Sequence, residues 1–154
     1  MKNMSQSITQ SLYTQILEHM PIPAVDFVLQ NQKKVLLALR KDEPAKGQWW
    51  IPGGRIQKNE TLEAAIKRKA LQEIGIEVEI IRKINCYEVF FDNAPFPEVK
   101  TGVHYLSVCY LIKPKDKNIV ITLDKTQEKH KWIDKIEPTL HPYVKQVLND
   151  AKVF

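Results

Sequence analysis

Residues 49–76 constrain the fold more than any other part of the chain, because an apolar run, a glycine pair and a helical pattern follow one another there. The run at residues 49–51 is typical of a short strand. Gly53 and Gly54 come next, and glycine backbone can approach a ligand more closely than backbone that carries a Cβ atom. Arg55 can then form two parallel hydrogen bonds with a phosphate. The segment therefore predicts a strand and a ligand-binding loop that lead into a helix.

We predict this helix at about residues 60–74, with Gly75 ending it because glycine readily adopts positive φ. One face is apolar, at Leu62, Ile66, Ala70 and Ile74. A second face is polar, at Arg68, Lys69, Gln72 and Glu73. For an isolated helix, a solvated pair of Lys69 with Glu73, worth roughly 0.2–0.5 kcal/mol, explains the polar face well. Periodicity alone therefore does not assign chemistry to this face.

The rest of the chain alternates short apolar runs with turn residues, a pattern that predicts strands. These runs lie at residues 24–29, 35–39, 76–81, 87–91, 103–112, 119–121 and 132–133. A second helix is predicted from Pro142, which suits a first helical position, with an apolar stripe at Val144, Val147, Leu148 and Ala151. Strands packed between a central and a terminal helix predict an α+β fold with α/β/α layers.

The composition is that of one soluble domain, since 44% of the 154 residues are apolar and 27% are charged. Apolar residues at four-residue steps predict an amphipathic helix over residues 5–20. We therefore divide the chain into an N-terminal helix at 1–20, a candidate dimer contact, and a domain at 21–154. No run approaches the roughly 20 apolar residues of a membrane span, and the N-terminus lacks a signal-peptide pattern. We expect a cytoplasmic protein with no membrane partner.

Lys and Arg outnumber Asp and Glu by 23 to 18, and a net charge of +5 suits nucleic acid, an acidic membrane or a phosphorylated small molecule. The lysines are scattered and are not interleaved with aromatic residues, which favours a solvated surface over a nucleic-acid groove. Cys86 and Cys109 are too few for a disulfide framework and are not spaced as a zinc site. We expect two buried or half-buried thiols and no nucleic-acid partner.

The spacing of polar residues after the glycine pair is more specific than their periodicity. The matching positions, in chain order, are Gly54, Glu60, Arg68, Glu73, Gly75 and Ile76. They resemble the Nudix box, whose pattern is Gly-x5-Glu-x7-Arg-Glu-U-x-Glu-Glu-x-Gly-U with U apolar. The resemblance implies the Nudix fold, a mixed β-sheet held between helices. It also implies hydrolysis of a nucleoside diphosphate linked to another group.

The chain departs from this pattern at Lys69 and Gln72, where the Nudix box has glutamates, so Glu73 is the remaining carboxylate on the polar face. Several ions would need several carboxylates, so one Mg²⁺ is expected. This reduced box resembles that of the GDP-mannose mannosyl hydrolases, and the likeness spans residues 21–132, including the run at 47–55. It implies that water displaces GDP from C1 of the sugar, in a Mg²⁺-dependent homodimer, with Mn²⁺ as the alternative ion.

The resemblance assigns roles one residue at a time. The implied ligands of the ion are the carbonyl of Gly53, the carboxylate of Glu73, and Gln127. The implied catalytic residues are Arg55, Arg68 and Glu128. The implied substrate contacts are Asp26, Arg40 and Tyr105. Structural roles remain open for these last three, because an aspartate can cap a turn and a tyrosine can belong to the core. The arginine can instead pair with Asp42 or Glu43.

The general base falls in the loop at residues 124–132, where the match is least regular. With one gap, Gln127 takes the ligand position and Glu128 the position of the base. Without the gap, Gln127 stands at the base position, where an amide cannot accept a proton. We therefore predict Glu128 as the base, with His130 and His104 as alternatives. A carboxylate is a weaker base than imidazole unless burial raises its pKa.

Three functions are consistent with these residues. The first is hydrolysis of a GDP-sugar, most simply GDP-mannose, at the sugar carbon. The second is a Nudix pyrophosphatase that cleaves another nucleotide between its phosphates. The third is a Nudix-fold module that binds a nucleotide sugar without turnover. Their products distinguish them, since attack at carbon releases free sugar and a nucleoside diphosphate, whereas attack at phosphorus releases a sugar phosphate.

Overall fold

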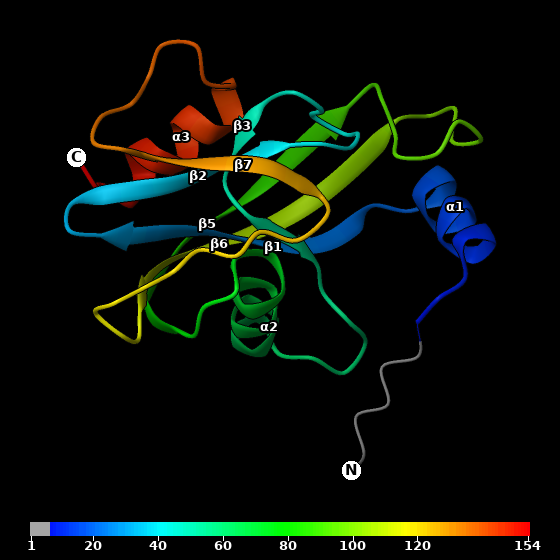
Figure 1. The fold of residues 1–154 in the computed structure, drawn as a ribbon. Coiled ribbons are helices and arrows are strands. Elements are labelled where there is room, and N and C mark those ends of the chain that lie inside the picture. Colours follow the sequence, from blue (N-terminus) through cyan, green and yellow to red (C-terminus); the bar gives the residue numbers. More distant parts are fainter. Residues whose placement is uncertain (1–6) are drawn as a thin grey trace.

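The computed structural model describes residues 7–154 and contains both helices and strands. In chain order the elements are α1 (Gln10–His19), β1 (Ile22–Asn31), β2 (Lys34–Arg40), β3 (Trp49–Trp50), β4 (Gly53–Arg55), α2 (Leu62–Ile74), β5 (Val78–Phe91), β6 (Val103–Pro114), β7 (Gln127–Ile133) and α3 (Pro142–Ala151). Figure 1 shows α2 and α3 on opposite faces of the sheet, with α1 at one end. The predicted α+β class is confirmed.

The centre of the sheet is β1. Within residues 7–154 the strands form a seven-stranded sheet in the order β3-β2-β1-β6-β5, with β4 paired to β1 and β7 paired to β2. β1 runs parallel to β6 over residues 22–29, and its last residues pair with β2. β4 pairs antiparallel with the first half of β1, which places Gly53 opposite Asp26. The glycine pair is therefore built into the sheet beside its central strand.

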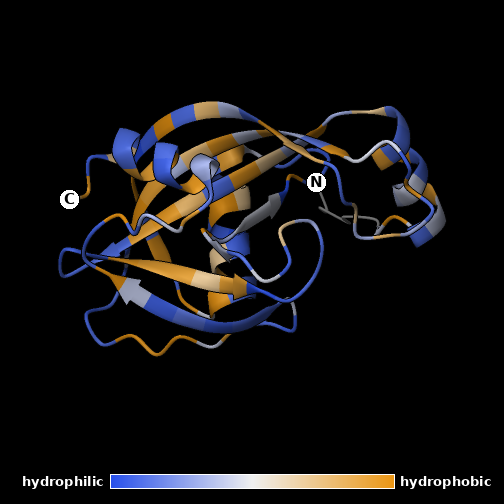
Figure 2. Cartoon of the chain, turned by 90° about the horizontal axis from the view of Figure 1, so that it is seen from above, coloured by the Kyte–Doolittle hydropathy of each residue, from blue (hydrophilic) through white to orange (hydrophobic). Residues whose placement is uncertain are grey.

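Each face of the sheet is covered by one helix. α2 buries its predicted apolar ridge against β1 and its neighbours, at Ile66, Ala70 and Ile74. α3 buries its predicted stripe on the opposite face, at Val144, Val147, Leu148 and Ala151. Figure 2 shows both blue and orange segments along the helices, as expected for elements with one buried face. Removal of these apolar side chains from water is the main force that holds the layers together.

Local signals determine both ends of α2. The hydroxyl of Thr61 accepts a hydrogen bond from the N–H of Ala64 at 3.2 Å, so the helix begins at Leu62 and not at the predicted residue 60. Gly75 ends the helix at a φ of 72°, and its N–H donates to the carbonyl of Leu71 at 3.2 Å. The predicted glycine stop is confirmed.

Three strand predictions are wrong in detail. Residues 78–81 and 87–91 belong to the single strand β5, whose mostly exposed polar middle still pairs with β6, while residues 76 and 77 precede the strand. Residues 119–121 form no strand, because Ile119 and Ile121 pack as loop residues against the cluster under α2. β4 was not predicted, since glycine has a low strand propensity and the pairing with β1 is what makes it a strand.

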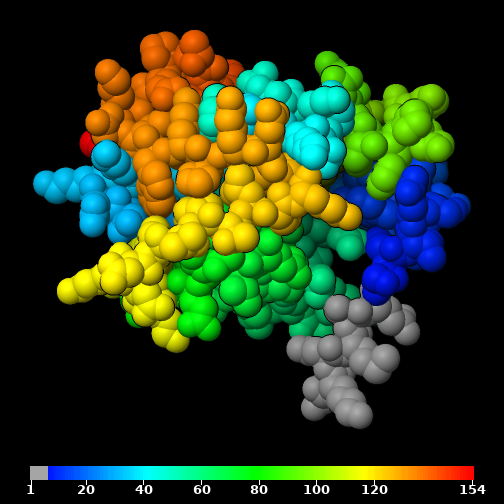
Figure 3. Space-filling view, in the orientation of Figure 1, coloured from blue at the N-terminus to red at the C-terminus, as the bar shows by residue number. Residues whose placement is uncertain are grey.

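The N-terminal helix packs on its own chain. Leu17 is buried against Val99, and the carboxylate of Glu18 accepts the N–H of Lys100 at 2.8 Å. Figure 3 shows α1, in dark blue, against the light-green segment near residue 100. The predicted helix over residues 5–20 is longer than α1, and residues 5 and 6 lie outside the described part of the chain.

The two thiols differ in exposure. Cys109 is buried on β6, as predicted, but Cys86 is exposed, which contradicts the expectation of two shielded thiols. The physical reason is that Cys86 lies in the polar middle of β5, an edge strand of the sheet.

Between residues 7 and 154, no helix has both the length and the apolar character that a membrane crossing requires.

Candidate functional site

A cavity of about 420 Å³ opens beside the glycine pair. Its lining includes six residues with roles implied by the sequence, which are Asp26, Arg40, Gly53, Arg55, Glu73 and Tyr105. It also includes Gly54 of the predicted ligand-binding loop and Lys69 of the polar helix face, together with residues that were not predicted, among them Tyr13, Ser107 and Thr126. A concave space with several converging polar groups is the usual form of a small-molecule site. Arg68, Gln127 and Glu128 do not line it.

Asp26 is fixed at the cavity by two hydroxyl groups. Its Oδ2 accepts hydrogen bonds from Ser107 Oγ at 2.7 Å and from Tyr143 OH at 2.5 Å. Burial raises the pKa of Asp26, while these two bonds and the charge of Arg40 oppose the rise. Because Asp26 lies in the middle of β1, the interpretation that it caps a turn is wrong.

Gly53 is required by its contact with β1. A Cβ atom at this position would lie 2.7 Å from the Cα of Asp26 and closer still to Asp26 Oδ1 and the carbonyl oxygen of Val25. No side chain fits there without separating β4 from β1. The glycine therefore allows the loop to reach the cavity next to the carboxyl of Asp26.

Ser107 and Tyr143 are site residues that the sequence did not reveal. Ser107 is two residues from Tyr105 on β6, so strand alternation places both on one face and was a usable signal. Tyr143 comes from α3, where it stacks on Trp50 with ring centroids 5.3 Å apart. Its hydroxyl also lies 3.2 Å from the sulfur of Cys109. No local pattern marks this tyrosine.

Glu73 is buried, and both oxygens of its carboxylate have partners. Its Oε2 accepts the N–H of Gly53 at 3.1 Å, and its Oε1 lies 2.9 Å from Lys69 Nζ. Burial raises the pKa of Glu73, and the charge and hydrogen bond of Lys69 lower it. The pair between these residues, expected for an isolated helix, is present but is buried rather than solvated.

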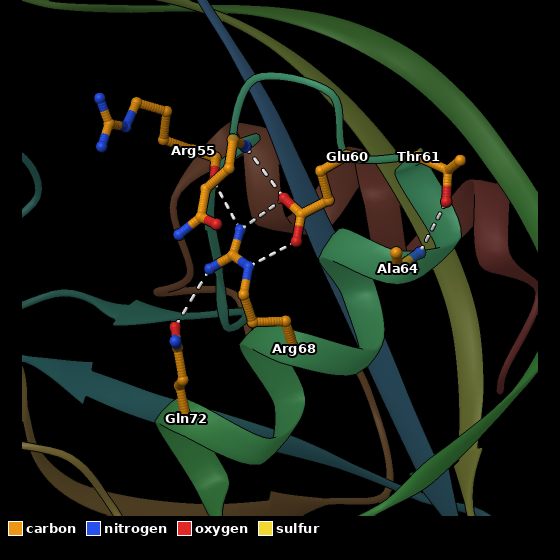
Figure 4. A network of polar contacts seen from close by, with 7 residues as sticks. Arg55, Glu60, Thr61, Ala64, Arg68 and Gln72 are labelled. Carbon is orange, nitrogen blue, oxygen red and sulfur yellow. Dashed lines mark hydrogen bonds and ion pairs between the residues drawn. The ribbon is translucent and has the colours of Figure 1, made fainter. Parts of the chain in front are cut away.

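Arg68 ties α2 to the glycine loop (Figure 4). Its Nε and Nη2 donate to the two carboxylate oxygens of Glu60 at 2.6 and 2.8 Å, and Nη2 also donates to the carbonyl of Arg55 at 3.1 Å. Its Nη1 donates to Gln72 Oε1 at 3.1 Å. The Arg68 hydrogen bond lowers the pKa of Glu60. In this arrangement Arg68 positions the loop and does not reach the cavity.

The side chain of Arg55 points away from this network, as Figure 4 shows. Its guanidinium carbon lies 4.8 Å from the centre of the Tyr13 ring, a cation–π contact that connects α1 to the cavity. Burial raises the pKa of Tyr105, and the neighbouring Tyr13 adds to the rise. Both tyrosines line the cavity, so Tyr105 is largely buried and still available to a ligand.

Arg40 bonds to backbone rather than to acidic side chains. Its Nε donates to the carbonyl of Pro44 at 2.8 Å, and its Nη2 lies 3.5 Å from the carbonyl of Asp42. None of the ion pairs found within residues 7–154 involves Arg40, so the alternative of a pair with Asp42 or Glu43 is wrong. The guanidinium remains on the cavity wall.

The residues predicted from the loop at 124–132 lie away from the cavity. Gln127 is buried, and its Oε1 has no hydrogen-bond partner within the described residues. Glu128 and His130 are exposed on β7. His104 stacks on Phe90 with ring centroids 4.3 Å apart. The structure therefore does not bring any of the three candidate bases to the cavity wall.

The residues present do not fit the expected divalent ion as they are arranged. Mg²⁺ requires oxygen ligands in near-octahedral geometry, and here both oxygens of Glu73 are already bonded, one of them to an ammonium group. Within residues 7–154 no three His, Cys, Asp or Glu side chains converge as a metal site. The implied ligand Gln127 does not line the same cavity.

Comparisons with known proteins identify the family. The NUDIX domain profile matches residues 20–150. The chain is 34% identical over 137 residues to the low-salt glycan biosynthesis protein Agl8 of Haloferax volcanii, a match that covers 87% of this chain and 84% of that protein. It is 28% identical over 92 residues to the ADP-ribose pyrophosphatase of Methanocaldococcus jannaschii, which covers 60% of this chain and 50% of that protein.

Solved structures agree in fold. The MutT NUDIX hydrolase of Burkholderia pseudomallei has a TM-score of 0.67 and 20% identity, with 87% of this chain and 100% of that chain covered. The NUDIX domain of Shewanella oneidensis NrtR, solved with ADP ribose, has a TM-score of 0.65 and 22% identity, with 94% and 97% covered. The profile match over residues 20–150 and the relative at 34% identity show that the chain belongs to the Nudix family. Its broad class is that of a Nudix hydrolase, a group that generally uses divalent metals.

Proposed function

We propose that this chain hydrolyses a GDP-sugar of the GDP-mannose type to GDP and free sugar, with water attacking C1 of the sugar. The proposal rests on one observation: α2 contributes a single carboxylate to the cavity wall, that of Glu73, and this carboxylate is already paired with Lys69. Attack at phosphorus in a site with several ions needs several carboxylates to hold them. Attack at carbon needs stabilisation of the departing diphosphate, which cationic side chains can supply.

The proposal gives a role to four charged residues of the cavity wall. Arg40, Arg55 and Lys69 provide positive charge for the diphosphate. Asp26 accepts a hydrogen bond from a sugar hydroxyl, since its Oδ2 is already held by Ser107 and Tyr143. The relative from Haloferax volcanii, named as a glycan biosynthesis protein, supports a substrate that contains a sugar.

Two further residues act around the cavity. The hydroxyl of Tyr105 donates a hydrogen bond to the diphosphate, because burial and Tyr13 raise the pKa of Tyr105 and keep the hydroxyl protonated. Arg68 acts by holding the carbonyl of Arg55 in place, and a direct contact of Arg68 with substrate remains a prediction.

The decisive experiment is hydrolysis of GDP-mannose, GDP-glucose and ADP-ribose in water labelled with heavy oxygen. We expect GDP-mannose to be cleaved fastest, with the label in the released sugar. Label in the phosphate product would overturn the proposal. It would favour the second candidate, a pyrophosphatase, which the relative from Methanocaldococcus jannaschii supports. Tight GDP binding without turnover of any substrate would instead identify a binding module.

Glu128 remains the proposed general base, although its exposed side chain must turn toward the cavity to act. Glu128→Gln should lower kcat by about 10²- to 10⁴-fold, the range for a lost proton acceptor. His130→Ala, two residues along the same strand, is the matched control and should leave kcat unchanged. The reverse result would show that the gapped match of this loop is wrong.

The metal is tested in the same assay. The resemblance implies Gly53, Glu73 and Gln127 as ligands of one Mg²⁺ ion, with Mn²⁺ as the alternative, whereas the pair of Lys69 with Glu73 does not favour an ion there. The assay is therefore run with each ion and with EDTA. We also propose a homodimer in which α1 contributes the contact, since Leu12 and Met20 expose 46% and 59% of their surface. Light scattering that shows a monomer at all concentrations would remove the dimer.

A further inference from the structure

The proposed function uses Lys69 only as one of three sources of positive charge, and the position of this lysine beside Glu73 says more. It stands one turn before Glu73 on α2, and its ammonium lies 2.9 Å from Glu73 Oε1 with 16% of the side chain exposed. In the Nudix box this position is an acid, so the substitution reverses the charge at this point of the cavity wall. The lysine therefore places a cation beside the one carboxylate that α2 contributes to the cavity.

Gly54 provides the space for this lysine. A Cβ atom at Gly54 would lie 2.6 Å from Lys69 Cε and 2.9 Å from Lys69 Nζ. The end of the lysine side chain thus lies directly against the backbone of the glycine loop, with Glu73 on its other side. These contacts hold the long side chain in one place, so the entropic cost of ordering it is met before a ligand arrives.

The ammonium retains capacity for a ligand. An ammonium group has three N–H donors, and the one hydrogen-bonding partner found for Lys69 within residues 7–154 is Glu73. Arg55 and Arg40 line the same cavity. A divalent ion placed on Glu73 would lie within a few Å of this ammonium, and the repulsion between the two cations opposes its binding.

We infer that Lys69 is a resident cation of the site, which holds the substrate's diphosphate itself and excludes a divalent ion from Glu73. The inference rests on the proposed function only in that the substrate carries a diphosphate. The divalent ions of the family are then unnecessary for binding the diphosphate in this chain.

The test uses two probes that do not depend on the sugar or the base. The first is Mn²⁺ alone, followed by electron paramagnetic resonance, and the second is inorganic pyrophosphate in EDTA, followed by calorimetry. The variant is Lys69→Met, and Lys67→Met is the matched control, because Lys67 is exposed on the same helix and does not line the cavity. Lys69→Gln is the second variant should the first unfold, and thermal unfolding checks both.

We expect Lys69→Met to bind Mn²⁺ at least about tenfold more tightly than the wild type and pyrophosphate at least about tenfold more weakly, since loss of one charge contact is commonly of this size. Lys67→Met should match the wild type in both measurements. The inference is overturned if the Lys69 variants bind either probe, Mn²⁺ or pyrophosphate in EDTA, as the wild type does.

The outcomes are separable from those of the hydrolysis assay. Normal cleavage of GDP-mannose at carbon, together with unchanged probe binding in the Lys69 variants, refutes the resident cation and leaves the proposed function standing. Failure of all nucleotide-sugar hydrolysis, together with the expected probe binding, refutes the proposed function and leaves the resident cation standing.

Discussion

Substitution of Gly53 by alanine tests the contact between the glycine loop and the central strand. The added methyl group would lie 2.7 Å from the Cα of Asp26, well inside the 3.4 Å at which ordinary van der Waals contact begins. It would be closer still to Asp26 Oδ1 and to the carbonyl oxygen of Val25. Backbone atoms of β1 cannot swing away, and the carboxyl is held by Ser107 and Tyr143. β4 must therefore move away from β1.

Overpacking of this kind typically costs 1–3 kcal/mol, and because the clash is with backbone we expect about 3 kcal/mol for Gly53→Ala. For a domain of this length each kcal/mol lowers Tm by about 2–4 °C, so the variant should melt about 6–12 °C below the wild type. Circular dichroism melts, with urea unfolding as a second measure, check this value.

The neighbouring glycine is the matched control. The added methyl group of Gly54→Ala meets the Lys69 side chain instead of backbone, and rotation about the bonds of that side chain can relieve the contact, so its cost should stay below about 1 kcal/mol. Equal melting temperatures for the two variants, or a Gly53→Ala melt within about 2 °C of the wild type, would refute the argument that backbone contact sets the cost.

Three further substitutions test the polar contacts. Glu60→Gln should lower the free energy of unfolding by about 1–3 kcal/mol in urea titrations near neutral pH. The Arg68 hydrogen bond lowers the pKa of Glu60 in the folded protein, so its stabilisation is present above the pKa that Glu60 has in the unfolded chain. It is lost as pH falls through the lower, folded pKa. The free energies of unfolding of variant and wild type should therefore converge in acid. Asp26→Asn should slow turnover. Because the folded pKa of Asp26 is raised, the wild type loses stability as pH rises through that pKa, and the variant should not show this loss. A variant that keeps the same dependence of stability on pH would show that Asp26 is not its source. Tyr143→Phe should lower the free energy of unfolding by about 1–3 kcal/mol, and an unchanged melting curve would show that its bond to Asp26 contributes little.

Local interactions explain what could be predicted. The ends of α2 depend on Thr61 and Gly75, which act within one turn of the chain, and the buried ridge follows from helical periodicity. The pair of Lys69 with Glu73 was visible at its four-residue spacing, but its burial was not, because β4 and β1 shield it. Spacing alone thus showed the contact and not its environment.

Features of the site that depend on long-range interactions could not be predicted from the sequence. Tyr143 and Asp26 are 117 residues apart, and only the packing of α3 on the sheet brings the hydroxyl to the carboxyl. The position of Glu128 depends on the register of β7 against β2, which buries Gln127 and turns the next side chain to solvent. A motif match in the loop carries no information about that register.

The contact of the Tyr13 ring with Arg55 affects where such chains should be truncated for expression. The profile begins at residue 20, yet this aromatic group precedes it and forms part of the cavity wall. A version trimmed to the profile boundary would retain every strand described above and lose the surface on which the guanidinium rests. Without Tyr13, the side chain of Arg55 would lose its cation–π contact and Tyr105 would become more exposed to solvent. The truncated protein would then have a normal circular dichroism spectrum but a lower activity than the full chain.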